Sequence, residues 1–183
     1  MKNFVRYNGE HIYLSPIRAD DEAVELYTKW VNDESINGWI GKSNCVYTLE
    51  DEQQWAQKNH GIKFNIVLKS DYTSDGLEKL IGNCGFTSVN NKSGTIGVLI
   101  GEEIGRDKGY GTEVIKLLIK FGFEELNLHR ISLTLNSENN RAFRCYLKAG
   151  FKEYGRAHEE LYFHGHYADR IYMEILEQDY FGK

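Results

Sequence analysis

The sequence predicts an α/β fold with one mixed, mostly antiparallel twisted sheet flanked by about four helices. Two patterns in the chain predict it. Short apolar runs separated by turn residues fill the middle of the chain, and a strongly helical apolar period follows them and leads into another strand pattern. The length of 183 residues suits one compact domain, so we expect a single domain over residues 1–183.

The first third of the chain has one strand pattern and two helix patterns. Residues 11–17 alternate well enough for a strand, and the aspartates at 20–21 can cap the helix that follows. Thr48 stands three residues before Asp51, which is a capping-box-like start for a second helix over 49–59.

Consecutive strands are predicted in the middle of the chain. Residues 64–68, 79–89 and 95–100 have strand patterns, with a turn at 71–76 and a hairpin connection at 90–94. We find no long linker and no internal repeat between these strands. They are therefore expected to pair antiparallel in a single sheet.

A helical period begins after this hairpin and is the strongest in the chain. Its apolar residues at i, i+3, i+4 and i+7 are Val114, Leu117, Leu118 and Phe121. Residues 130–136 have the next strand pattern, so this helix bridges two strands as a βαβ-like crossover.

The last part of the chain predicts one more helix and two strands. The helix covers about 140–149 and ends at Gly150, the residue type that best tolerates a left-handed C-cap. Residues 151–163 and 166–176 are then two strands separated by a turn that contains Gly165.

Composition excludes several classes of protein. Lys and Arg number 22 against 27 Asp and Glu, and the net charge of −5 argues against a nucleic-acid partner while mildly favouring cationic substrates. No run of about 20 apolar residues is present and the N-terminus is polar, so we expect a cytoplasmic protein that does not cross a membrane. The three cysteines lack CxxC spacing, and we expect neither disulfides nor a metal site.

A glycine-containing segment lies between the strand at 95–100 and the long helix. Its residues are Arg106, Asp107, Lys108, Gly109, Tyr110, Gly111 and Thr112. Free backbone N–H groups at a helix start, with the positive end of the helix dipole behind them, can bind a diphosphate. Taken alone, a pair of glycines this close is more often part of an ordinary loop than of a binding site.

Two spaced motifs give this segment a context. Arg106, Gly109 and Gly111 resemble the pyrophosphate loop of the GNAT superfamily of acetyl-CoA-dependent N-acetyltransferases. That loop has Arg or Gln, two variable residues, Gly, any residue, and Gly or Ala. The segment 139–151 is similar to a second motif of the same family, with Asn, then Ala three residues on, Tyr four further, and a closing Gly-Phe.

The resemblance covers nearly the whole chain. It is most specific from about residue 95 to residue 151, and the tail from 155 to 173 resembles the branch that contains ribosomal-protein N-terminal acetyltransferases and spermidine acetyltransferases. The resemblance is weakest in the first two helices, where this family forms its acceptor site. It implies a transferase that uses acetyl-CoA as co-substrate and acetylates a primary amine.

The family resemblance also implies roles for named residues. The cofactor-binding residues that it implies are Val98, Leu99, Ile100, Arg106, Asp107, Lys108, Gly109, Tyr110, Gly111, Thr112, Asn139 and Lys148. The backbone of the first three would pair with the pantetheine arm, and a backbone N–H there would polarise the thioester carbonyl. Tyr146 would protonate the departing thiolate, unless it only packs as an aromatic side chain on its helix.

Two residues depart from the family pattern. Asp107 stands where relatives often have Gly or another small residue, and Thr95 stands where many have Glu, so a base at that position is missing. The amine must nevertheless lose a proton, and Glu34 at the end of the first helix is the candidate base near the acceptor site. The alternatives are Glu102, Glu103, His164 and His166.

The acceptor itself has no motif in the sequence. A protein N-terminal amine is the leading expectation, and a polyamine or another small amine is its rival. A non-catalytic CoA-binding module is an alternative from another class, which Tyr146 argues against. A homodimer is compatible with the sequence, which carries no signal for or against one.

Overall fold

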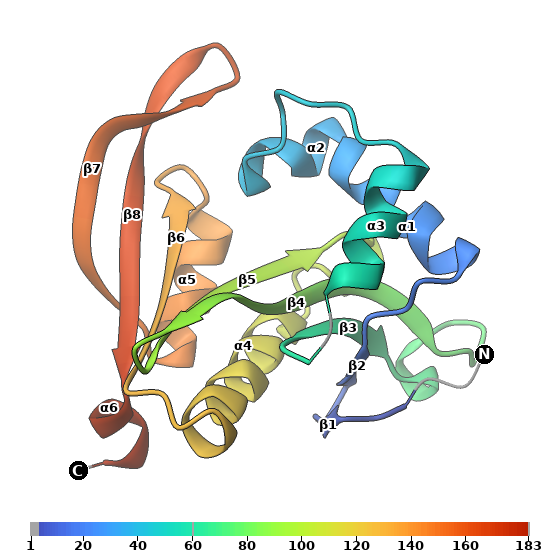
Figure 1. Cartoon of the computed structure of the whole chain (residues 1–183), viewed down its shortest axis with the longest axis horizontal. Helices are drawn as coiled ribbons and strands as arrows, with labels where there is room; N and C mark the ends of the chain where they lie inside the picture. The colour runs from blue at the N-terminus through green and yellow to red at the C-terminus, as the bar shows by residue number, and fades with distance from the viewer. Residues whose placement is uncertain (1–3, 60, 183) are drawn as a thin grey trace. The chain divides into compact units, whose positions relative to one another are not determined.

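The computed structural model describes residues 4–59 and 61–182, and within them the chain forms eight strands in one hydrogen-bonded order, β1-β2-β3-β4-β5-β6-β8-β7 (Figure 1). The strands are β1 Tyr7–Asn8, β2 Ile12–Pro16, β3 Lys63–Leu68, β4 Lys79–Asn90, β5 Ser93–Ile100, β6 Arg130–Asn136, β7 Lys152–Phe163 and β8 His166–Leu176. The helices are α1 Asp21–Asn32, α2 Glu34–Asn37, α3 Leu49–Lys58, α4 Tyr110–Lys120, α5 Asn140–Ala149 and α6 Glu177–Phe181. The predicted α/β class with a mixed, mostly antiparallel sheet is confirmed.

The chain divides into two compact units. The first unit comprises the described residues up to Gly85 together with Val98–Val114, and the second comprises Phe86–Gly97 and the residues from Ile115 onward. Strands β4 and β5 and helix α4 each contribute residues to both units. The single domain expected from the chain length remains a prediction.

The first unit is built on an antiparallel ladder. Strand β2 pairs with β3 from Ile12 opposite Leu68 to Pro16 opposite Phe64, and β3 pairs in turn with β4. Helices α1, α2 and α3 bury a common core with the end of β5. This core contains Ala23, Tyr27, Trp30, Ile36, Ala56 and Leu99.

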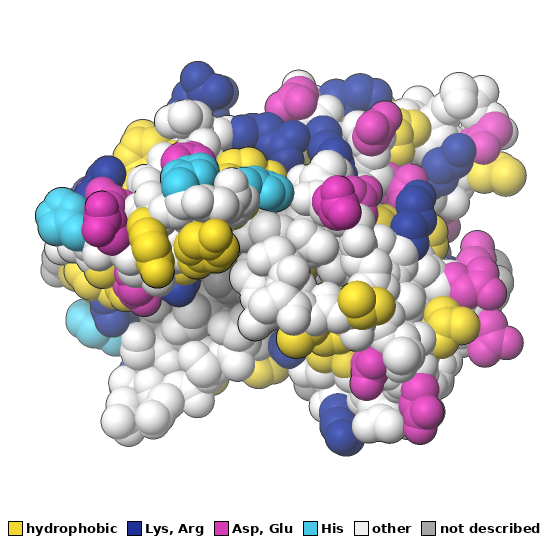
Figure 2. All heavy atoms as spheres, turned by 90° about the horizontal axis from the view of Figure 1, so that it is seen from above, with side chains coloured by type: hydrophobic (Ala, Val, Ile, Leu, Met, Phe, Trp, Pro, Cys, Tyr) yellow, Lys and Arg dark blue, Asp and Glu magenta, His cyan; other side chains and the backbone are white. Residues whose placement is uncertain are grey.

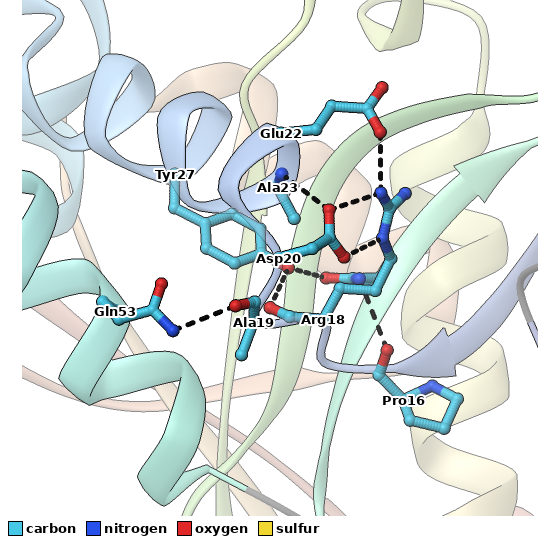
Figure 3. A network of polar contacts seen from close by, with 9 residues as sticks. Pro16, Arg18, Ala19, Asp20, Glu22, Ala23, Tyr27 and Gln53 are labelled. Atoms are coloured by element: carbon cyan, nitrogen blue, oxygen red, sulfur yellow. Dashed lines mark hydrogen bonds and ion pairs between the residues drawn. The ribbon is translucent and has the colours of Figure 1, made fainter. Parts of the chain in front are cut away.

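A polar network fixes the connection between β2 and α1 (Figure 3). Asp20 caps the helix by accepting a hydrogen bond from the Ala23 N–H, as the sequence predicts. Its carboxylate also accepts hydrogen bonds from Nε and Nη2 of Arg18, both at 2.7 Å. Buried Tyr27 donates its hydroxyl to the Asn65 side-chain oxygen at 2.6 Å. Both strands of the ladder are thereby attached to the first helix.

The second unit contains the parallel crossover. Strand β5 pairs parallel to β6 over Ser93–Thr95 and 130–132, whereas β8 pairs antiparallel along the whole length of β6. Figure 1 shows β7 and β8 as one long hairpin. In the core, the Phe86 ring lies 5.9 Å from the Phe121 ring, edge to face.

Three expectations about local structure need correction. Short helices α2 and α6 add to the four helices predicted, because helices of four or five residues have too few turns to show a period. The β4–β5 connection is a two-residue turn, with positive φ at both Asn91 and Lys92, rather than the five residues 90–94. The α4 helix widens into a π-helical turn, Phe121–Glu125, in which Phe121, Gly122 and Phe123 are all buried.

Candidate active site

The end of β5 rests on the first helix. A Cβ atom at Gly101 would lie 2.2 Å from the Trp30 ring, so only glycine allows this close approach. The next residue, Glu102, accepts hydrogen bonds from the Trp30 indole N–H at 2.8 Å and the Lys29 ammonium at 2.9 Å. Desolvation opposes ionisation of Glu102, but these two donors outweigh it and lower the pKa of the carboxyl. Glu102 is therefore an ionised group that is held through its Oε1 by Trp30 and Lys29.

The loop between β5 and α4 turns twice through left-handed backbone conformations. Asp107 has φ of 58° and Gly109 has φ of 86°. Asp is among the residue types that best tolerate such a conformation, which explains how it replaces the small residue common in the family. The Glu113 N–H donates to the Gly109 carbonyl at 3.2 Å, so the helix begins directly after Gly109. The loop thus leads into the N-terminus of a helix, where backbone N–H groups favour anions.

The predicted loop residues contribute in different ways. Arg106 donates from Nη2 to the Gly101 carbonyl at 2.9 Å, and its Nε is buried with no hydrogen-bond partner among the described residues. Tyr110 is buried, with its ring centroid 5.4 Å from that of His11, so it can offer a ligand only backbone atoms. Lys108 is exposed, and its ammonium can approach a phosphate from solvent. An unsatisfied guanidinium N–H beside a helix start fits a diphosphate.

The second motif is a helix with strong caps at both ends. The Asn139 side-chain oxygen accepts a hydrogen bond from the Ala142 N–H at 3.1 Å, and Gly150 ends α5 with φ of 103°. The predicted C-cap is confirmed. Asn139 is thus the N-cap of α5, a role that the sequence interpretation had not assigned to it. Lys148 lies exposed in the last turn of this helix.

Tyr146 lies on α5 near the end of the helix. Its ring packs edge to face against Phe151 with centroids 6.0 Å apart. The residue keeps some solvent exposure, but its phenol is surrounded closely enough that desolvation, with a smaller contribution from Cys145, raises its pKa. The phenol therefore stays protonated at neutral pH, as a general acid must.

The candidate bases lie in varied surroundings. Glu34 is exposed at the start of α2, and Glu103 is also exposed. His166 forms an ion pair with Glu138 at 2.7 Å, so its ring is already engaged. His164 has φ of 46° in the β7–β8 turn and is exposed. Of these groups, Glu34 and Glu103 have the carboxylates most open to solvent.

The structure places the predicted residues in two groups. Val98 to Ile100 and Arg106 to Thr112 belong to the first unit, whereas Asn139, Tyr146 and Lys148 belong to α5 in the second. Strand β5 continues to Ile100, five residues beyond the last residue of its ladder with β6. The sequence interpretation missed three residues that hold this region. Trp30 packs against Gly101, and His11 contacts Tyr110 and Glu113 of α4. No local pattern marks them, because their partners are distant in sequence.

The surface and composition of the described residues limit other functions. They contain no group of three or more His, Cys, Asp or Glu side chains that could hold a metal ion. No helix among them is long and apolar enough to cross a membrane. On the face of the molecule that Figure 2 shows, Lys and Arg side chains lie next to Asp and Glu side chains and form no continuous basic band.

Comparison with known families decides the assignment. Residues 11–152 match the model of the acetyltransferase (GNAT) domain, which is more than half of the chain. The chain belongs to the GNAT acetyltransferases. It is therefore an N-acetyltransferase, and the family uses acetyl-CoA.

Relatives of this GNAT protein include characterised and uncharacterised enzymes. It is 28% identical to the spermidine N(1)-acetyltransferase of Vibrio cholerae over 170 residues, which is 92% of this chain and 79% of the relative. It is also 28% identical to the uncharacterized N-acetyltransferase YnaD of Bacillus subtilis over 165 residues, 88% of this chain and 90% of the relative.

Solved structures share the fold. A GNAT acetyltransferase from Bacillus anthracis matches with a TM-score of 0.77 at 24% identity, covering 94% of this chain and 98% of the other. The spermidine N-acetyltransferase of Vibrio cholerae, crystallised with CoA and spermine, matches with a TM-score of 0.78 at 22% identity, covering 93% and 98%.

Proposed function

We propose that this acetyltransferase transfers the acetyl group of acetyl-CoA to a primary amine of a polyamine or similar small polycation. The observation that carries the choice of acceptor is the charge of the helical segment where the family forms its acceptor site. Residues 20–59 contain nine acidic residues, of which only Glu52 is buried, against three lysines. Such a surface attracts a cationic acceptor and raises its local concentration. The relationship to spermidine acetyltransferases gives further support.

The diphosphate of acetyl-CoA is proposed to bind at the start of α4. Residues 108–111 can supply backbone N–H groups there, and the positive end of the helix dipole favours the anion. The unsatisfied Arg106 Nε–H and exposed Lys108 add donors. By resemblance to the family, the backbone of Val98, Leu99 and Ile100 holds the pantetheine arm, and Asn139 and Lys148 are further contacts.

The transfer needs two proton movements. The acceptor nitrogen attacks the thioester carbonyl, so a C–N bond forms, the C–S bond breaks and the sulfur leaves as a thiolate. Tyr146 is proposed to donate its phenolic proton to that sulfur, a role that the family resemblance implies and that the phenol, protonated at neutral pH, can perform.

The base that takes the proton from the amine is proposed to be Glu34. Its carboxylate is exposed at the start of α2, in the acidic segment 20–59, and can act directly or through a water molecule. Glu102 has less support because Trp30 and Lys29 already bind its carboxylate. A Glu34→Gln variant that keeps its activity at pH 7 would exclude Glu34.

A protein N-terminal amine, the leading expectation from the sequence, is the second candidate acceptor, because the tail at 155–173 resembles a branch that contains N-terminal as well as spermidine acetyltransferases. Thiol release from acetyl-CoA, measured with spermidine, with spermine and with a peptide carrying a free N-terminus and no lysine, separates the two. We expect turnover with the polyamines. Turnover with the peptide alone would overturn the polyamine proposal, and no turnover with any amine would overturn amine transfer by this chain.

A further inference from the structure

A carboxylate in the first turn of α4 is held by a strand about one hundred residues earlier in the chain. Oε1 of Glu113 accepts hydrogen bonds from the backbone N–H groups of His11 at 3.0 Å and Ile12 at 3.3 Å. Its Oε2 lies 3.0 Å from Nδ1 of the His11 ring. Three donors from the start of β2 thus meet one side chain of the helix that follows the diphosphate loop.

The surroundings are shaped to receive this carboxylate. The Glu113 side chain is only 19% exposed. A Cβ atom at Gly9 would lie 2.0 Å from its Oε1, so a side chain there would displace the carboxylate. The His11 ring packs against the rings of Tyr72 and Tyr110, at centroid distances of 4.6 and 5.4 Å. Tyr110 is itself a loop residue, so β2 holds the helix start at two points.

The negative charge of Glu113 is the reason why its hydrogen bonds to His11 and Ile12 matter for an anion bound at the helix start. A carboxylate in the first turn of a helix competes with a bound anion for the positive end of the helix dipole. Hydrogen bonds from two backbone N–H groups and from the imidazole disperse the charge of Glu113 and turn it toward Gly9 and His11. The carboxylate of Glu113 is then turned away from an anion bound at the helix start.

We propose that Glu113 and His11 are positioning residues, which fix the start of α4 in the orientation that binds the diphosphate of CoA. This inference rests on the proposed binding of the diphosphate by Arg106 to Thr112. Neither residue needs to touch the cofactor. Their effect is on the affinity of the loop, because a small displacement of the helix start moves several N–H donors together.

Steady-state kinetics with two acyl donors test the proposal. Acetyl-CoA has the diphosphate, whereas S-acetylpantetheine lacks it. In Glu113→Ala we expect KM for acetyl-CoA to rise about tenfold, as befits the loss of charged hydrogen bonds, with kcat within about twofold. For S-acetylpantetheine we expect kcat/KM to match the wild type.

Two further variants sharpen the result. Gly9→Ala leaves α4 unchanged in sequence but displaces the carboxylate, so it should raise KM for acetyl-CoA in the same way. Glu113→Gln keeps one acceptor oxygen for the backbone N–H groups and should restore most of the affinity. The matched control is Glu177→Ala, which removes a more exposed His–Glu pair at 3.1 Å, His129 with Glu177. It should leave both donors unaffected.

Equal losses with both donors, or no change in KM in Glu113→Ala and Gly9→Ala, would overturn the positioning role. Calorimetric titration with CoA keeps this result separate from the proposed function. If the wild type binds CoA, the variants bind it more weakly and no amine is acetylated, the proposed acetyl transfer to an amine is overturned and the positioning role is kept. If the wild type acetylates an amine and the variants bind CoA with wild-type affinity, only the positioning role of Glu113 and His11 is overturned. A wild type that binds no CoA would overturn both.

Discussion

The loop at 106–112 in the first unit and helix α5 in the second carry the two halves of the family motif, and they are held by different kinds of contact. Helix α5 has its own caps, Asn139 at one end and Gly150 at the other. The loop depends on residues that are distant in sequence. The Trp30 ring packs against Gly101 at the end of β5, and the His11 ring lies within hydrogen-bond distance of the Glu113 carboxylate. One motif half is thus determined locally and the other by tertiary contacts.

This difference indicates where each half is vulnerable. A substitution within α5 should affect the stability of that helix or the function of Tyr146, which the helix carries. A change at Trp30, far from the loop in sequence, should disturb the loop and the core of the first unit together. Substitutions in each half therefore test whether the two halves are held in these different ways.

Tyr146→Phe removes the proposed acid and leaves the helix intact. We expect kcat to fall about 10²- to 10⁴-fold, the usual contribution of a general acid, with CoA affinity and stability nearly unchanged. Because desolvation raises the pKa of Tyr146, wild-type kcat should show no fall between pH 7 and about 9.5 that is due to this group. The control is Tyr167→Phe, on an exposed ring. Wild-type turnover in Tyr146→Phe would rule out the acid role.

Trp30→Ala tests the long-range support of the first unit. The side chain is fully buried and its indole N–H binds Glu102, so we expect the free energy of unfolding to fall by about 3–5 kcal/mol. Urea denaturation measures the loss. Trp39→Ala, in which the replaced ring is 37% exposed, is the control and should cost less. Equal losses in the two variants would contradict this account of the β5 end.

Gly150→Ala tests the C-cap of α5. A φ of 103° is strained for any residue with a Cβ, and that atom would also lie 3.3 Å from the Ile175 side chain. We expect a loss of about 1–2 kcal/mol in the free energy of unfolding. Gly155→Ala is the matched control, because its Cβ would meet nothing within 4 Å. A stable Gly150→Ala protein would mean that the helix end can rearrange.

Asn139→Ala removes the N-cap and should cost about 1 kcal/mol in the free energy of unfolding. Asn139→Ser keeps a capping oxygen, so it separates the cap from the proposed contact with CoA. If KM for acetyl-CoA rises in the serine variant while stability is kept, the cofactor contact is supported. Asn140→Ala, at the exposed neighbour, is the control.

The smallest effect is expected from the pH dependence of the His166–Glu138 pair. The hydrogen bond that His166 donates to Glu138 raises the pKa of His166 above its ordinary value of 6.5. A raised pKa means that the pair stabilises the fold fully below pH 6.5 and loses its contribution as pH rises through the folded-state value. An NMR titration of His166 should show a lower pKa in Glu138→Gln. An unchanged pKa would exclude the pair in solution.

The sequence anticipated the strands and helices whose signals are local. The Thr48–Asp51 capping box, the aspartate cap of α1 and the Gly150 C-cap are all present as predicted. Short helices α2 and α6 were missed because four or five residues are too few to show a period, and the π-helical turn after α4 was missed as well. The acceptor segment at 20–59 has an excess of acidic residues but no motif, and an excess of charge alone identifies no single ligand.

The sequence by itself determined that this chain is an α/β protein with the two spaced motifs of an acetyltransferase, because both motifs depend on residues close together in the chain. Only the tertiary structure decided how the loop at 106–112 is held. Glu113 meets His11 and Gly9 through strand pairing and helix packing, and no periodicity or spacing encodes a contact across about one hundred residues. The physical reason is that local conformation follows from neighbouring residues, whereas the orientation of a binding loop follows from the core beneath it.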